Sequence, residues 1–261
     1  MRGAPATARP HFMRRFFAAN TRASHRVAAA LGLESDKPFW DAFEQTAADK
    51  LRGLPSGSTV LDLGGGRRSV YAKALAEANP LRLVAVDVSP EELALNQDVE
   101  ETCVADVADE LPFADASIDL ILSRAALEHV DGVPAAARNM ARVLRPGGAA
   151  LHFVPCRYSL FGIAARLLAF GPLLRVLHAV DPESRGQTEF EVCYDHCYPS
   201  AIRDVFSEAG FREVSIEVCW AQPGYFEPVF PLFLLTSAYE FMVRRLRITG
   251  LAAYMIVSAV R

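Results

Sequence analysis

Cysteine is scarce in this chain of 261 residues, and the five cysteines form an odd set that no complete disulfide framework uses. Long uncharged apolar runs are also absent: residues 228–239 are far shorter than the roughly 20 residues that a helix needs to cross a bilayer. No apolar segment of about 7–15 residues follows the first arginines, so no secretory signal is predicted. These absences exclude a disulfide-stapled mini-protein and favour a reduced, cytoplasmic protein.

Charge is unevenly distributed along the chain. The formal net charge is −4, yet residues 1–33 hold six arginines and no acidic residue. The remainder is therefore strongly acidic, which argues against the broad basic face that a nucleic-acid partner requires. The basic segment is interpreted either as a solvated amphipathic helix or as a contact with an anionic membrane surface. Peripheral membrane contact thus stays open, and no nucleic-acid partner is expected.

The hydrophobic pattern predicts two helices followed by alternating strands and helices. Apolar residues recur at helical spacing over residues 12–31 and 38–51. Strands are then predicted at residues 59–63, 81–86, 103–105, 118–122 and 149–154, with helical stretches at 70–78 and 133–144 and a turn at 145–148. Residues 89–92 (SPEE) predict the start of another helix, with Ser89 as its N-cap and Pro90 at the first helical position. This alternation predicts parallel pairing through crossover helices, and hence a doubly wound α/β sheet.

Three of the predicted strands end at a carboxylate: Asp62, Asp87 and Asp106. Ligands of open parallel sheets bind at the carboxyl ends of the strands. A glycine turn, residues 64–66, follows the first strand, and glycine lets the backbone approach a ligand that a Cβ atom would strike. A carboxylate at the end of the second strand can accept both hydroxyls of a ribose. Together these features predict a nucleoside-binding edge.

The same motifs carry a resemblance to a known family. They are residues 60–66 (VLDLGGG), 86–90 (VDVSP), 105–107 (ADV) with 111–113 (LPF), 117–121 (SIDLI), 127–130 (LEHV) and 144–148 (LRPGG). In this order and spacing the chain resembles the class I S-adenosylmethionine-dependent methyltransferases of the small-molecule type. The resemblance covers residues 57–155 closely and residues 195–261 more loosely.

The resemblance implies a role for each matching residue. Asp87 would accept hydrogen bonds from the ribose hydroxyls of S-adenosyl-L-methionine, with Val88 against the adenine face. Asp106 would accept from the adenine amino group, and the backbone of Val107 would donate to the ring. The methionine part of the cofactor would be lined by Asp62, Gly64, Gly65, Gly66 and Ser123.

One position departs from the family pattern. The family's turn reads Asp-x-Gly-x-Gly-x-Gly, and its last position here is Arg68. The arginine side chain points outward, narrows the methionine pocket, or pairs with the cofactor carboxylate. The nicotinamide alternative is weaker, because Ser69 stands where the dinucleotide fingerprint has its third glycine.

The implied fold is a Rossmann-like, mostly parallel sheet of seven strands whose last strand is antiparallel. Its last two strands are predicted at residues 211–220 and 252–260, and each follows a helix, at 201–208 and 232–246 respectively. We expect a single methyltransferase domain. Its parts are an N-terminal helical lid (1–56), a cofactor-binding half (57–155), an inserted helical cap (156–200) and the C-terminal end of the sheet (201–261).

Methyl transfer from a sulfonium needs alignment above all, and a general base only where the acceptor must lose a proton. His129, which follows the fourth strand, is the first candidate for that base. The other candidates are His152, His196, Asp195 and Glu128. Cys193, His196 and Cys197 fit no common zinc spacing, so no metal is predicted.

Aromatic residues around the predicted cap suit a small, apolar or aromatic acceptor, although each of them also suits the core. They are Phe153, Tyr158, Phe161, Phe170, Tyr194, Tyr198, Tyr225 and Phe226. The predicted function is methyl transfer to such a molecule. The alternatives are a non-catalytic binding or scaffold protein with this fold, and a membrane-associated methyltransferase of lipids or quinones.

Overall fold

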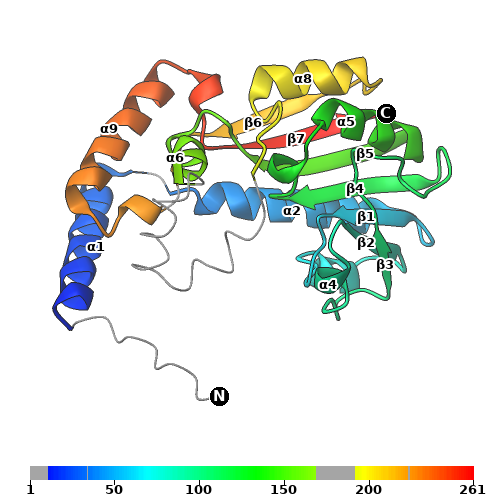
Figure 1. Cartoon of the computed structure of the whole chain (residues 1–261), viewed down its shortest axis with the longest axis horizontal. Helices are drawn as coiled ribbons and strands as arrows, with labels where there is room; N and C mark the ends of the chain where they lie inside the picture. The colour runs from blue at the N-terminus through cyan, green and yellow to red at the C-terminus, as the bar shows by residue number, and fades with distance from the viewer. Residues whose placement is uncertain (1–10, 34, 169–191, 223) are drawn as a thin grey trace.

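A computed structural model describes residues 11–33, 35–168, 192–222 and 224–261. Its seven-stranded sheet has the order β3-β2-β1-β4-β5-β7-β6 (Figure 1). The strands are β1 (Thr59–Leu63), β2 (Arg82–Asp87), β3 (Glu101–Val104), β4 (Ile118–Arg124), β5 (Leu144–Pro155), β6 (Ser215–Cys219) and β7 (Tyr254–Val260). β1 to β5 pair in parallel, whereas β7 runs antiparallel to β5 and β6. The predicted fold class is confirmed.

Helices cover both faces of the sheet. They are α1 (His11–Leu31), α2 (Lys37–Gly53), α3 (Ala72–Ala76), α4 (Pro90–Leu93), α5 (Val133–Val143), α6 (Leu160–Leu168), α8 (Pro199–Glu208) and α9 (Phe230–Arg245). Side chains of a strand alternate between its two faces. Leu120 and Leu122 of β4 therefore pack with α2, whereas Ile121 between them packs with α5.

An aromatic cluster fixes α2 on the sheet. The Phe153 ring of β5 stacks on Trp40, with 3.8 Å between the ring centroids, and meets Phe43 at 5.5 Å and Tyr254 at 5.1 Å. Phe153 is fully buried. Of the two roles considered for Phe153, the structure supports the core and not the lining of an acceptor pocket. Phe161 likewise packs against Tyr254, at 5.2 Å.

The predicted turn at residues 145–148 lies inside β5 as an irregularity. Ile118 pairs with Leu144 and Leu120 pairs with Ala149, so residues 145–148 stand opposite Asp119 alone. Gly147 has a φ of 81°, a value that glycine adopts without strain. The extra residues bulge out of the ladder, and Arg145 pairs with Asp119 at 2.6 Å. Two other predictions were too long: α3 and β6 are shorter than the stretches 70–78 and 211–220.

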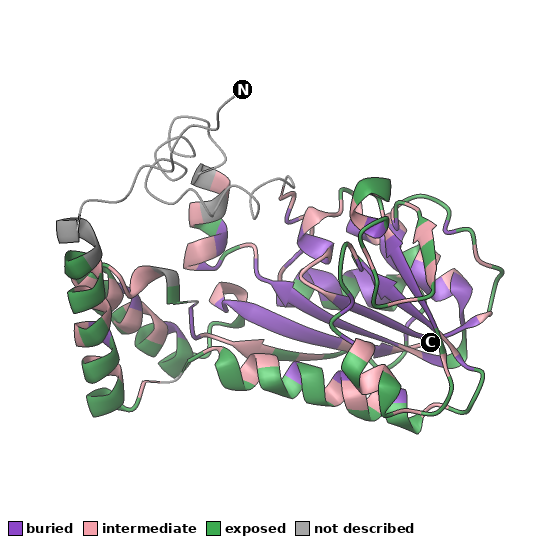
Figure 2. Cartoon of the chain, turned by 90° about the horizontal axis from the view of Figure 1, so that it is seen from below, coloured by how far each residue is buried: buried purple, intermediate pink, exposed green. Residues whose placement is uncertain are grey.

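α1 and α9 lie side by side at the end of the molecule away from β3 (Figures 1 and 2). Ser24 Oγ donates to the Glu227 carbonyl at 2.9 Å, and His25 Nε2 lies 2.8 Å from Glu227 Oε2. The predicted lid thus contributes α1 to this helix pair and α2 to the sheet. Of the predicted cap, α6 and residues 192–198 are described, and residues 169–191, with Phe170, lie outside the described residues. Within the described ranges, every helix is too short or too polar to span a membrane.

The aromatic cluster generates a prediction on stability. We expect Phe153→Ala to lower the free energy of unfolding by about 3–5 kcal/mol, because it leaves a cavity between α2 and the sheet. Phe241→Ala is the matched control, since this ring is 69% exposed and its loss should cost less than about 0.5 kcal/mol. Urea denaturation of both variants checks the difference. Equal losses would contradict the packing described.

Candidate functional site

The candidate site lies at the carboxyl ends of β1, β2 and β4. From β1 the sheet continues through β2 to β3 on one side and through β4 to β5 on the other. The strand order therefore reverses between β1 and β4, and ligands of open α/β sheets bind at such a reversal. β1 brings Asp62 to this edge and β2 brings Asp87.

The glycine turn fits tightly between neighbouring segments. A Cβ atom on Gly64, whose φ is 74°, would lie 2.5 Å from the Ala126 Cβ in the loop after β4. A Cβ atom on Gly65 would lie 2.8 Å from the Ala85 Cβ of β2. Both distances are too short for real carbon atoms, so these two glycines are required by the chain's own packing.

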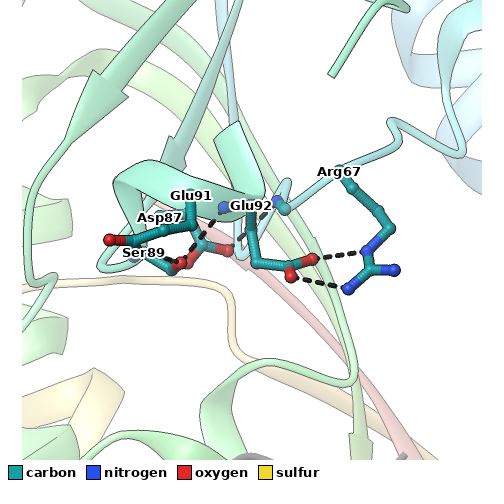
Figure 3. Close-up of polar contacts among 6 residues, drawn as sticks. Arg67, Asp87, Ser89, Glu91 and Glu92 are labelled. Carbon is teal, nitrogen blue, oxygen red and sulfur yellow. Dashed lines mark hydrogen bonds and ion pairs between the residues drawn. The ribbon is translucent and has the colours of Figure 1, made fainter. Parts of the chain in front are cut away.

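Asp87 is held by backbone amides on both sides. Its Oδ2 accepts the Gly66 N–H at 3.0 Å, and its Oδ1 accepts the Ser89 N–H at 2.9 Å (Figure 3). Ser89 also caps α4 by accepting the Glu92 N–H at 3.1 Å, as the Ser-Pro sequence predicts. Each carboxylate oxygen has room for a second hydrogen bond. The half-buried carboxylate is therefore oriented and can still accept from a ligand.

An ion pair fixes the outer side of the turn. Arg67 Nη2 lies 2.6 Å from Glu92 Oε1, and Arg67 Nε donates to Glu92 Oε2 at the same distance (Figure 3). Arg68, which replaces the last glycine of the family pattern, is exposed. The first of the two arginines therefore ties the turn to α4.

Asp62 is a buried carboxylate, 4% exposed, at the end of β1. Burial raises the pKa of Asp62 to about 7, and the hydrogen bond from Ser69 Oγ, at 2.7 Å, and the charge of Arg124 act in the opposite direction. The buried Tyr71 hydroxyl has no hydrogen-bond partner among the described residues. Tyr71 interacts electrostatically with both Asp62 and Arg124. This corner suits a ligand that brings a positive charge and further polar groups.

Val88, Asp106 and Val107 are the residues that the resemblance assigns to an adenine site. The Ala105 N–H donates to the Asp87 carbonyl at 3.0 Å, which holds the end of β3 against the end of β2. Val88 is 56% exposed, and Asp106 is exposed with its Oδ1 accepting the Ala108 N–H at 2.8 Å. Val88 and Asp106 are therefore exposed near Asp87, whereas the Val107 side chain is buried in the core.

The Ser123 hydroxyl makes a buried contact with a histidine. Ser123 Oγ lies 2.7 Å from His152 Nδ1, and both residues are fully buried. Burial lowers the pKa of His152 to about 3, so its imidazole is neutral at physiological pH. His152 also packs against Phe206 of α8. His152 therefore belongs to the interior of the sheet.

His129 lies in a 3-10 turn, η1 (Leu127–His129), beside a buried acid. Its Nε2 is 3.8 Å from Glu128 Oε1, and its side chain is 33% exposed. Burial raises the pKa of Glu128 to about 8, and Glu128 Oε2 has no hydrogen-bond partner in the part of the chain that the structure describes. The Cys193 and Tyr194 amides both donate to the Glu128 carbonyl at 2.8 Å. These bonds bring the end of the predicted cap to this turn.

A second histidine with a carboxylate partner lies in the same segment. His196 Nδ1 is 2.6 Å from Asp195 Oδ1, and Asp195 Oδ2 accepts the Val133 N–H at the start of α5 at 3.0 Å. Tyr194 and His196 both have positive φ angles, of 50° and 51°. Such backbone geometry is strained in residues other than glycine and clusters at functional sites.

The remaining candidates divide between the interior and the surface. Tyr194 is buried, whereas Tyr158 and Tyr198 form a partly exposed ring pair with centroids 5.3 Å apart. Phe226 is half-buried, and the side chain of Tyr225 lies outside the described residues. Within the described ranges, no group of three His, Cys, Asp or Glu side chains is placed to hold a metal ion.

Sequence reasoning missed the residues that complete the Asp62 corner. Ser69 is named above only as a missing glycine, although its hydroxyl bonds to Asp62 and its amide donates to Asp98 at 3.1 Å. Tyr71 gives no local signal, because an aromatic residue at the start of a helix normally indicates core packing. Arg124, at the end of β4, lies 5.7 Å from the centre of the Trp40 ring.

The chain is similar to known methyltransferases. Residues 61–152 match a family model described as a methyltransferase domain. A ubiquinone/menaquinone biosynthesis C-methyltransferase of Pseudomonas putida is 30% identical over 210 residues, which cover 73% of this chain and 80% of the relative. The 27-O-demethylrifamycin SV methyltransferase of Amycolatopsis mediterranei is 34% identical over 128 residues, or 42% of this chain and 47% of the relative.

A solved structure with the same fold is phosphoethanolamine N-methyltransferase 2 of Haemonchus contortus. The TM-score is 0.55 at 15% identity, and the match covers 84% of this chain and 52% of that one. That structure holds phosphomonomethylethanolamine and S-adenosylhomocysteine. This chain thus spans about half the length of that neighbour, and at this identity the likeness establishes the fold alone.

The Ser69–Asp62 hydrogen bond generates a prediction on proton affinity. The bond stabilises the ionised carboxylate, so Ser69→Ala should raise the pKa of Asp62 above its value of about 7. Carbon-13 NMR titration of the aspartate carboxyls measures the pKa directly. Ser56→Ala, at an exposed serine, is the control and should leave the pKa unchanged. An unchanged or lower pKa in Ser69→Ala would contradict the assigned bond.

Proposed function

The chain belongs to the class I S-adenosylmethionine-dependent methyltransferases, and we propose that it methylates a small, apolar, aromatic acceptor bearing a hydroxyl group. The observation that supports methyl transfer at this site is the oriented Asp87 carboxylate beside the Asp62 corner, at the point where the strand order reverses. The activity and the cofactor follow from the family. The acceptor class and the residue roles below are our proposals.

S-adenosylmethionine supplies a methyl group on a positively charged sulfur. Asp87 would accept hydrogen bonds from the ribose hydroxyls through its unused lone pairs. Asp62 would face the ammonium group, and the unpartnered Tyr71 hydroxyl would donate to the methionine carboxylate. Gly66, with a φ of 39° and no side chain, keeps the space beside Asp87 open. The residues present therefore fit this cofactor.

The remaining cofactor contacts follow the order of the strands. Val88 would cover one adenine face, Asp106 would accept from the adenine amino group, and the Val107 N–H would donate to the ring. Gly64 and Gly65 would shape the turn without contributing side chains. Ser123 would act through its position at the end of β4, since its hydroxyl is bonded to His152.

A relative named for C-methylation in ubiquinone and menaquinone biosynthesis supports an aromatic acceptor, and a relative named for 27-O-demethylrifamycin SV supports an acceptor with a hydroxyl group. In this chain, the partly exposed pair of Tyr158 and Tyr198 offers aromatic surface to such a ring. Arg157 Nη1, which donates to the Tyr194 carbonyl at 2.8 Å, ties this pair to the segment that contacts η1.

Proton removal from the acceptor is assigned to His129. Its Nε2, which lies 3.8 Å from the largely protonated carboxyl of Glu128, would take the hydroxyl proton. The acceptor oxygen then carries the negative charge that makes it, or the ring carbon beside it, nucleophilic. His196 is the second candidate, because Asp195 fixes its Nδ1 and leaves Nε2 to accept a proton.

The cofactor assignment is tested by calorimetric titration with S-adenosylmethionine and S-adenosylhomocysteine. Asp87→Ala should weaken binding by about tenfold or more, because it removes hydrogen bonds to a charged acceptor. Asp109→Ala, at an exposed acid of the neighbouring loop, is the matched control. Equal affinity of wild type and Asp87→Ala would contradict the ribose role. No binding by the wild type would favour the non-catalytic alternative.

The general base is tested with an acceptor identified from a set of hydroxylated aromatic compounds. His129→Gln should lower kcat by about 10²–10⁴-fold, with cofactor affinity unchanged. His196→Gln is measured beside it. If His196→Gln shows that loss instead, the base is His196, and if neither does, the acceptor needs no histidine base.

A further inference from the structure

The outward face of α9 is apolar from Pro231 to Met242. Most of the exposed residues of α9 recur at the spacing of one helical face. Those on this face are Pro231, Leu234, Leu235, Ala238, Phe241 and Met242, and Leu232, Arg244 and Arg245 are exposed as well. Leu235 and Phe241 are 68% and 69% exposed, which is unusual for side chains of this size. A contiguous row of apolar side chains on a protein surface marks an interaction site.

The opposite face of α9 makes the contacts with the rest of the molecule. Thr236 and Val243 are buried there. The Phe230 N–H donates to Asn20 Oδ1 of α1 at 3.2 Å. The only acidic residue of α9, Glu240, is directed inward and accepts the Gln222 N–H at 3.0 Å. The helix is therefore anchored through its mixed face, and its apolar face is left to solvent.

Positive charge accompanies this apolar row. Arg245 lies at the end of α9, beyond this row, and Arg247 follows the helix; both are exposed. On the neighbouring helix α1, Arg15, Arg22 and Arg26 are exposed and, at spacings of seven and four, share one helical face. α1 contains no acidic residue. The outer face of this end of the molecule is largely exposed (Figure 2).

We propose that α1 and α9 together form a docking surface for a bilayer that contains anionic lipids. Exposed leucine and phenylalanine side chains gain free energy by entering the acyl-chain boundary, and arginines gain it from anionic headgroups. A second copy of the chain fits less well. Pairing two such surfaces would bring arginines together, and no exposed acid of α9 is available to compensate them. The surface is independent of the methyl acceptor proposed above.

Vesicle flotation of the full chain tests the surface. We expect binding to phosphatidylcholine vesicles that contain phosphatidylglycerol, much weaker binding to phosphatidylcholine alone, and weakening of binding as salt is raised. Arg22→Gln with Arg26→Gln should reduce the partition coefficient about fivefold for each arginine removed. Leu235→Ser should reduce it about tenfold or more, because a buried leucine is lost from the acyl-chain boundary.

Matched controls carry the same substitutions elsewhere. Arg203→Gln on α8 and Leu95→Ser after α4 change exposed residues far from α1 and α9, and both should leave binding unchanged. Thermal melting and cofactor titration show whether each variant remains folded. Absence of wild-type binding to anionic vesicles, or equal losses in the control variants, would overturn the proposal. A dimer in light scattering that Leu235→Ser dissociates, without vesicle binding, would assign the surface to a second copy instead.

Discussion

The site depends on the carboxylate of Asp87, which accepts one amide from the turn after β1 and another from the start of α4. These two bonds fix the geometry between the ends of β1 and β2. They form only because Gly64 and Gly65 let the turn lie against Ala126 and Ala85 without a side chain. A carboxylate held by its own backbone has little orientational entropy to lose on binding. Packing of the turn thus prepares the residue that would meet the ribose.

Asp62 shows how the fold retains groups that do not serve its own stability. With a pKa near 7 in the folded state and 3.8 as its ordinary value, Asp62 holds a proton that the unfolded chain releases. Its contribution to the unfolding free energy is therefore complete at pH values below 3.8 and declines as the pH rises toward 7. A cationic ligand reverses this cost, because it stabilises the ionised carboxylate. The Tyr71 hydroxyl, which has no hydrogen-bond partner among the described residues, would gain one from the proposed cofactor.

Local sequence signals were sufficient to predict the sheet and its ligand-binding edge. They did not predict the contacts between residues that are distant in the sequence. The run Thr59–Leu63 followed by glycines, and the Ser89-Pro90 cap of α4, are encoded in adjacent residues, and both are confirmed. The bonds of Ser69 to Asp62 and of Ser123 to His152 depend on which side chains the register brings together. Phe153 has no local feature that distinguishes a ring under α2 from a ring over a pocket.

α9 illustrates why hydrophobic periodicity does not determine the direction in which a helix faces. Its apolar residues recur as they would on a helix packed into a core, and the sequence predicts only that a helix forms. Asn20, Ser24 and His25 of α1 hold the start of α9 through the Phe230 amide and Glu227. These polar contacts orient the helix with its apolar face outward, which the core of the sheet does not require. The orientation is therefore a property of the tertiary contacts and not of the hydrophobic pattern of α9 itself.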